Sequence, residues 1–137
     1  MLPTSSITIL KLDHNNIGTA GLAELARGLS KNSTLLVLSL AYCGIDKEGS
    51  KYLQQILAYV DTQLKMLDIQ GNMLQNEGVK ELCRVLKIND SLEEINLADN
   101  QFGETVVDDI CGVMSTNENL GVYDLNYNAI YDDGKSG

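Results

Sequence analysis

The side chains that could do chemistry in this sequence are one histidine, three cysteines and many carboxylates. His14 lacks the further histidines or cysteines that a hydrolase triad or a zinc site needs at suitable spacing. The cysteines Cys43, Cys83 and Cys111 form no CxxC pair, so we expect them to be reduced, buried, small residues in a reducing compartment. The sequence therefore predicts no enzyme activity, no catalytic residue, no cofactor and no metal.

Composition narrows the class of protein and its partners. The chain has 137 residues, 44% of them apolar and 21% charged, which is typical of a folded domain. Nineteen acidic residues against ten basic ones give a net charge of −9. This balance argues against nucleic acid and anionic membranes and favours a protein partner with a basic surface. The apolar runs are too short for a membrane span of about 20 residues.

One pattern of eleven residues, L-x-x-L-x-L-x-x-N/C-x-L, recurs five times in register. The copies start at residues 7, 35, 64, 92 and 120, with spacings of 28, 29, 28 and 28 residues. The second half of each repeat has the helical spacing of apolar residues, as in 78–86. One strand and one helix cannot bury their apolar faces alone. Stacked copies must therefore share a core between a parallel sheet and a layer of helices.

The ninth position of the pattern forms a polar column. It holds Asn15, Cys43, Asn72, Asn100 and Asn128. The chain turns there as it leaves each strand, and a buried amide can bond loop backbone groups that otherwise have no partner. The column thus gives a structural role to these five residues and explains how the chain turns repeatedly with one proline.

This pattern resembles the leucine-rich repeats, and the resemblance covers residues 7–134. The period of 28–29 residues, the full helix and the cysteine in the asparagine column resemble the ribonuclease-inhibitor-like subclass. The resemblance implies an α/β fold, a right-handed β-α solenoid shaped as a horseshoe arc, with the parallel sheet concave and the helices convex. It also implies an intracellular, cytoplasmic, eukaryotic protein that binds other proteins. No motif specific to one member is present.

The variable positions between the pattern leucines point away from the core, because side chains alternate along a strand. They place an apolar column beside acids and two tyrosines, a combination typical of protein-binding surfaces. Packing between neighbouring strands is the competing explanation for the apolar column. The predicted protein-binding residues on the concave face are Ile9, Lys11, Asp13, Val37, Tyr42, Met66, Asp68, Glu94, Asp99, Val122, Asp124 and Tyr127.

Two other functions stay open alongside a protein-binding scaffold. One is a fragment of a Ran-type GTPase-activating protein, which the subclass includes. An arginine finger is disfavoured because Arg27 and Arg84 both fall on predicted helices. The other is a structural subunit of a large intracellular assembly.

The ends of the repeat array carry no polar caps, which solenoids need. Residues 1–137 are expected to form one domain of about four and a half repeats, because Gly134 falls where a fifth helix would open. We therefore expect either a piece of a longer array or end-to-end self-association through the uncapped termini. A short protein with frayed ends is the remaining alternative. Asn32 and Asn89 match the glycosylation pattern but are expected to be ordinary loop residues.

Overall fold

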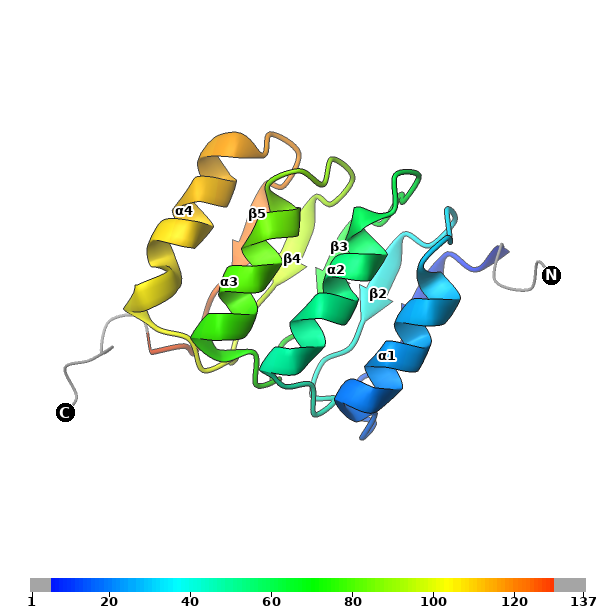
Figure 1. Ribbon diagram of the computed structural model, residues 1–137, viewed down its shortest axis with the longest axis horizontal. Coiled ribbons are helices and arrows are strands. Elements are labelled where there is room, and N and C mark those ends of the chain that lie inside the picture. The colour runs from blue at the N-terminus through cyan, green and yellow to red at the C-terminus, as the bar shows by residue number, and fades with distance from the viewer. Residues whose placement is uncertain (1–5, 130–137) are drawn as a thin grey trace.

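Each repeat contributes one short strand and, in the first four, one helix (Figure 1). The computed structural model describes residues 6–129. The strands are β1 (Ile9–Lys11), β2 (Val37–Ser39), β3 (Met66–Asp68), β4 (Glu94–Asn96) and β5 (Val122–Asp124). The helices are α1 (Gly18–Leu29), α2 (Ser50–Ala58), α3 (Gln75–Leu86) and α4 (Val107–Thr116), with short 3-10 helices η2 (Lys47–Gly49) and η3 (Glu104–Val106).

The five strands form one parallel sheet in the order of the sequence. Each strand pairs with the next at the same position of the repeat. Leu38 is level with Leu67, Leu67 with Ile95, and Ile95 with Tyr123. This register turns every position of the pattern into a column that crosses the sheet.

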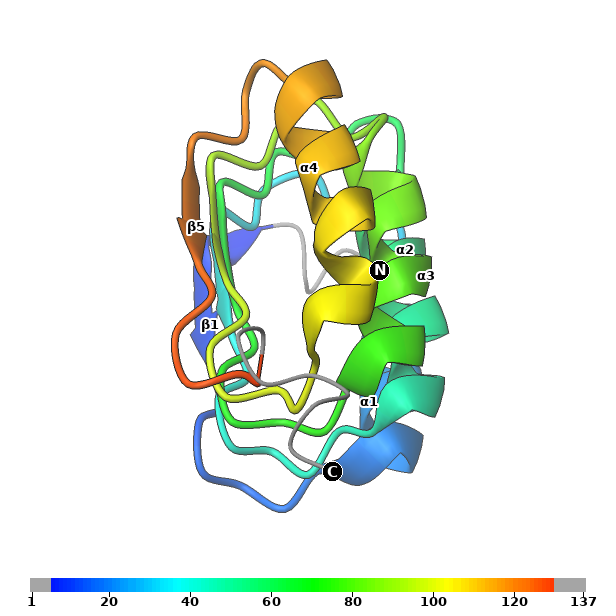
Figure 2. The ribbon, with the colours of Figure 1, turned by 90° about the vertical axis from the view of Figure 1, so that its left-hand side faces the viewer.

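The core lies between the sheet and the helices, which form two separate layers in Figure 2. Pattern leucines such as Leu38, Leu67 and Leu97 are buried, and Phe102 is the largest of the fully buried side chains. The amphipathic helices face them with residues such as Leu22. This arrangement confirms the predicted β-α solenoid with the parallel sheet on the concave side and the helices on the convex side.

Two kinds of strand-to-helix turn alternate along the array. In the first and third repeats the helix begins at a left-handed residue, Gly18 or Gln75. In the second and fourth repeats the left-handed residue comes earlier, at Gly44 or Gln101, and a 3-10 helix precedes the α-helix. The regular spacing of the sequence pattern does not reveal this alternation.

The cysteines are free, but the prediction that all three are buried is wrong for Cys111. This residue is exposed on α4, whose outer side has no neighbouring helix among residues 6–129. Met114 on α4 is 45% exposed for the same reason. Cys43 and Cys83 are buried, and burial raises the pKa of the Cys83 thiol to about 12.

Ile130 and Gly134, on which the expected fifth turn and helix depend, lie outside the described residues. Within residues 6–129, no helix is long and apolar enough to span a bilayer.

Candidate protein-binding face

The sheet register brings the predicted apolar column together on the side of the sheet away from the helices. Ile9 is level with Val37, Val37 with Met66, Met66 with Glu94, and Glu94 with Val122. Ile9 and Val122 are more than half exposed, whereas Val37 and Met66 are half-buried. The most accessible apolar positions of this column are therefore at its two ends.

The rim column, at the carboxyl ends of the strands, has left-handed backbone in every repeat. It consists of His14, Tyr42, Gly71, Asp99 and Tyr127, with φ between +55° and +75°. The His14 and Tyr42 rings stack with centroids 4.9 Å apart. On its other side, the Tyr42 ring occupies the space in which a side chain at Gly71 would lie. Tyr42 is thereby held in place, while Tyr127 is 81% exposed and belongs to a repeat three units away.

Asp13 was predicted as a binding residue, and its carboxylate is engaged within the protein. One carboxylate oxygen accepts hydrogen bonds from the Ser39 hydroxyl at 2.6 Å and from the Ala41 backbone N–H at 2.7 Å. Asp13 thus joins the first repeat to the second, and its charge is less available to a partner than the charge of the exposed Glu94.

A chain of polar side chains crosses the middle of the face. Gln70 donates to the Tyr42 hydroxyl at 3.2 Å and accepts from the Asn96 amide at 3.1 Å. Gln70 and Asn96 were not among the predicted site residues, although both occupy the variable columns. These hydrogen bonds join residues that are 26 to 28 positions apart in the sequence, so they form only because the sheet register places the repeats side by side.

Asp68 lies at the centre of the concave face and is half-buried. Burial raises the pKa of the Asp68 carboxyl, and the negative charges of Asp13 and Asp124 act in the same direction. The backbone N–H of Gln70 donates to the carboxylate at 3.0 Å and partly opposes this shift. A positively charged group placed over Asp68 would relieve the unfavourable interactions of the charged form.

This shift predicts how Asp68 affects stability. Because the folded-state pKa is raised, the folded chain binds the proton more tightly than the unfolded chain does. The free energy of unfolding therefore falls as pH rises through the folded pKa and stays lower at neutral pH. We expect Asp68→Asn to increase the free energy of unfolding at pH 7 by a few tenths of a kcal/mol to about 1 kcal/mol, because solvent screens a half-exposed charge. Urea unfolding at pH 7 and at about pH 3 measures the difference, which should vanish at the lower pH.

The control for this prediction is Asp108→Asn, which removes one charge from an exposed position on α4. An equal gain from Asp108→Asn would assign the effect to net charge and contradict the role given to the surroundings of Asp68.

The asparagine column holds consecutive repeats together beneath the rim. The Asn72 amide donates to the carbonyls of Leu40 and Ile69, and its oxygen accepts from the backbone N–H groups of Cys43 and Ile45, all within 3.1 Å. Asn128 makes the corresponding four bonds two repeats later, and Asn100, one repeat later, makes three of them, its oxygen accepting from the backbone N–H of Leu74. Asn15 is exposed and bonds its own repeat, so the expectation of a buried amide is wrong at this position.

A second asparagine column, which the repeat pattern did not reveal, lies at the opposite edge, where helices lead back into strands. Asn32, Asn89 and Asn117 are buried, and each oxygen accepts two backbone N–H groups of the following turn. Asn89 and Asn117 also donate to carbonyls of the preceding repeat. The amides of the two glycosylation patterns therefore have a structural role.

The acidic surplus is concentrated in the C-terminal third. Residues 88–129 contain no lysine or arginine. Their acidic residues are Asp90, Glu93, Glu94, Asp99, Glu104, Asp108, Asp109, Glu118 and Asp124. Residues 6–129 contain no group of three or more histidine, cysteine, aspartate or glutamate side chains placed to hold a metal ion.

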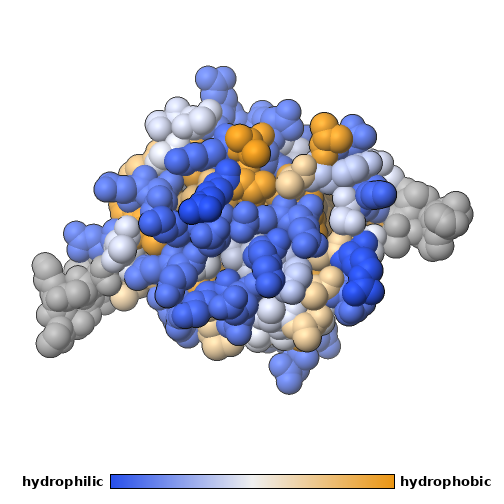
Figure 3. Space-filling model, in the orientation of Figure 1, coloured by the Kyte–Doolittle hydropathy of each residue, from blue (hydrophilic) through white to orange (hydrophobic). Residues whose placement is uncertain are grey.

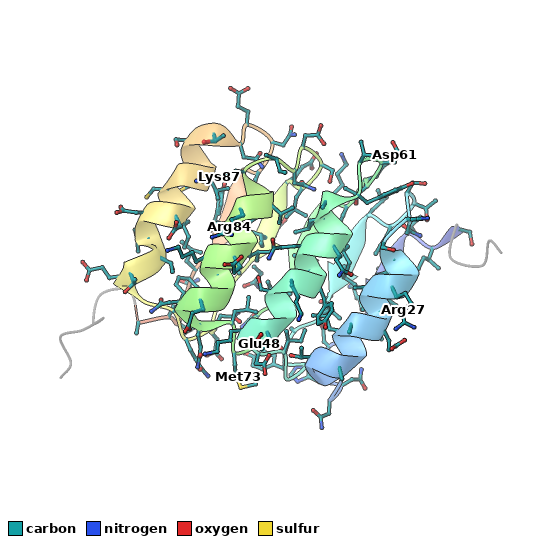
Figure 4. The ribbon with its side chains drawn as sticks, in the orientation of Figure 1. Arg27, Glu48, Asp61, Met73, Arg84 and Lys87 are labelled. Carbon is teal, nitrogen blue, oxygen red and sulfur yellow. The ribbon has the colours of Figure 1, made fainter. Side chains whose placement is uncertain are left out.

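The two arginines are on the helical face and not on the sheet (Figure 4). Arg27 pairs with Glu24 at 3.0 Å, and Arg84 pairs with Glu81 at 3.5 Å, each within one helix.

These repeats match a known family. The leucine-rich repeat family matches residues 5–26, 31–53 and 61–83 through one of its repeat types and residues 91–113 through a second. The chain belongs to the leucine-rich repeat proteins, and its similarity to a ribonuclease inhibitor agrees with the ribonuclease-inhibitor-like type.

Two curated relatives illustrate the similarity. NACHT, LRR and PYD domains-containing protein 13 of Homo sapiens is 30% identical over 98% of this chain and 13% of its own length. The ribonuclease inhibitor of Sus scrofa is 32% identical over 81% of this chain and 31% of its own length. The chain thus spans less than a third of either relative.

Solved structures share the fold at lower identity. The tropomodulin C-terminal domain of Caenorhabditis elegans has a TM-score of 0.76 and 18% identity, covering 90% of this chain and 75% of that domain. Actin-binding site 2 of leiomodin-1 has a TM-score of 0.81 and 16% identity, covering 90% of this chain and 72% of that one.

Proposed function

We propose that the chain is a protein-binding scaffold that recognises a basic protein surface through its concave sheet face. The single observation that carries this proposal is the open face itself, where exposed apolar residues lie beside carboxylates. Exposed apolar strips with a polar rim are typical of interaction sites. One relative is a ribonuclease inhibitor and one structural neighbour is an actin-binding site, so binding of proteins is the function that these likenesses favour.

The charge distribution supports a basic partner. Glu94, Asp68 and Asp124 lie on neighbouring strands, and residues 88–129, which contain two of them, include no lysine or arginine. Lysine or arginine side chains of a partner would meet these carboxylates, while their aliphatic stems lie over Met66 and Val122. Tyr42, held by His14 and Gln70, offers a rigid aromatic contact at the edge.

The test combines two substitutions on this face. Tyr42→Ala with Asp68→Lys is expected to weaken binding of the partner at least about tenfold, since it removes an aromatic contact and reverses a central charge. The partner is isolated from lysate on the immobilised chain and identified by mass spectrometry. Its affinity for each variant is then measured by calorimetry.

Asp108→Lys is the matched control, because it makes the same charge reversal on the exposed surface of α4. It should leave most of the affinity intact. Unchanged binding by the single and double concave-face variants would reject this face as the site.

The proposal describes a cytoplasmic protein without catalytic activity of its own. The pairing of Arg27 and Arg84 within helices disfavours an arginine finger. Measuring GTP hydrolysis by a Ran-type GTPase with and without the chain separates the scaffold from the GTPase-activating alternative. Acceleration of hydrolysis would overturn the scaffold proposal.

A further inference from the structure

Two aliphatic side chains are exposed on neighbouring loops where helices lead back into strands. Val60, after α2, is 85% exposed, and Ile88, after α3, is 77% exposed. The positions equivalent to Ile88 in the first and fourth repeats hold Lys31 and Thr116. The repeat itself therefore does not require an apolar residue there. Figure 3 shows apolar patches on this upper edge, next to a helical face that is mostly hydrophilic.

Grooves separate these loops. The groove between the loops after α2 and α3 has a volume of about 210 Å³ and is bordered by Ala58, Val60 and Ile88. The next groove, between the loops after α3 and α4, has a volume of about 240 Å³ and is bordered by Lys87, Ile88 and Thr116. Ile88 borders both grooves, so two adjacent hollows share one apolar ridge.

A row of carboxylates follows the same edge. Asp61, Asp90 and Glu118 occupy the same position in three consecutive repeats, and all three are exposed. None of them takes part in the ion pairs found among the described residues. Figure 4 places Asp61 on this edge and Met73 on the opposite one.

We propose that residues 58–62, 88–90 and 116–119, here called the loop edge, form a second protein-binding surface that takes a basic amphipathic helix of a partner protein. Adjacent packed helices lie about 8–10 Å apart, so neighbouring grooves repeat at a similar distance. Two side chains seven residues apart on a helix are about 10.5 Å apart along its axis. Apolar residues at this spacing would enter both grooves, with lysines or arginines facing the carboxylate row. This surface is distinct from the concave face.

The proposal is tested with a synthetic helical peptide of alanine and lysine that carries two leucines seven residues apart. Titration of the isotopically labelled chain, followed by NMR, should shift backbone amide signals in the loop edge. Ile88→Ser and Asp90→Lys should each weaken binding about tenfold, measured by fluorescence anisotropy. Both residues are exposed, so thermal unfolding should change little and show that the variants fold.

Met73→Ser is the matched control, since Met73 is a partly exposed apolar residue on the opposite edge. It should bind the peptide as the unaltered chain does. The proposal is overturned if the peptide does not bind, if the shifts are confined to the concave face around Asp68, or if Ile88→Ser binds with unchanged affinity.

Discussion

Asn72→Ala is expected to lower the free energy of unfolding by about 3 kcal/mol or more, although it deletes only a small polar group. The side chain is 2% exposed and is shared between two repeats. Its loss leaves the N–H groups of Cys43 and Ile45 and the carbonyl of Leu40 without their partner in a buried turn. The Ile69 carbonyl loses one of its two amide donors and keeps the bond from Asn100. Each buried backbone group left unsatisfied costs roughly 1–3 kcal/mol, reduced where water enters. Urea unfolding followed by circular dichroism measures the change.

Asn15→Ala provides the comparison within the same column. Asn15 is exposed and bonds only the carbonyls of Leu12 and Asp13 in its own repeat. Its replacement should cost less than about 1 kcal/mol, because water can satisfy the released groups. Similar losses for both variants would mean that burial and bonding between repeats do not determine the cost.

Phe102→Ala is expected to destabilise the fold by about 3–5 kcal/mol, the range for large-to-alanine changes in a core. Phe102 is fully buried in the fourth repeat, at a position that holds smaller residues such as Ile45 and Leu74 in the second and third. The cavity would lie in the core just before η3, next to the turn that Asn128 holds from the fifth repeat. Loss of the tyrosine circular dichroism signal during urea unfolding reports the change.

Tyr127→Ala removes an aromatic side chain of similar size from an 81% exposed position nearby. It should change the free energy of unfolding by no more than about 0.5 kcal/mol. Comparable losses from Phe102→Ala and Tyr127→Ala would contradict the prediction that burial of the ring determines the cost of its removal.

Most of the fold could be predicted from the sequence because the repeat imposes it. Five copies in register specify which residues pair across the sheet, and the pattern leucines identify the core. Cys111 is an exception: it is exposed, because burial at its position depends on a following helix and not on its own repeat. The helical spacing of apolar residues predicts burial only for a helix that has neighbours on both sides, and α4 has none on its outer side among residues 6–129.

The candidate site was harder to predict, because contacts between variable positions are specific to each pair of repeats. Asp13 looks like a free acid in the sequence, yet Ser39 and Ala41 bond its carboxylate. Gln70 looks unremarkable until the register places it between Tyr42 and Asn96. Sequence periodicity identifies the face on which a side chain lies, whereas its partners depend on the particular residues in the adjacent strands.

The alternation of turn types makes two repeats, and not one, the interchangeable unit of this array. Equivalent turns occur in the first and third repeats, which start at residues 7 and 64, so a given type of turn recurs only after two repeats. Junctions differ accordingly: Gly18 and Gln75 donate to the carbonyls of Cys43 and Asn100, whereas Met73 and Ala129 donate to those of Ile45 and Phe102. Excising a single repeat would bring mismatched junctions together, while excising a consecutive pair would restore the original bonding. Gene duplication, or an engineer lengthening the arc, would preserve these junctions by copying repeats two at a time.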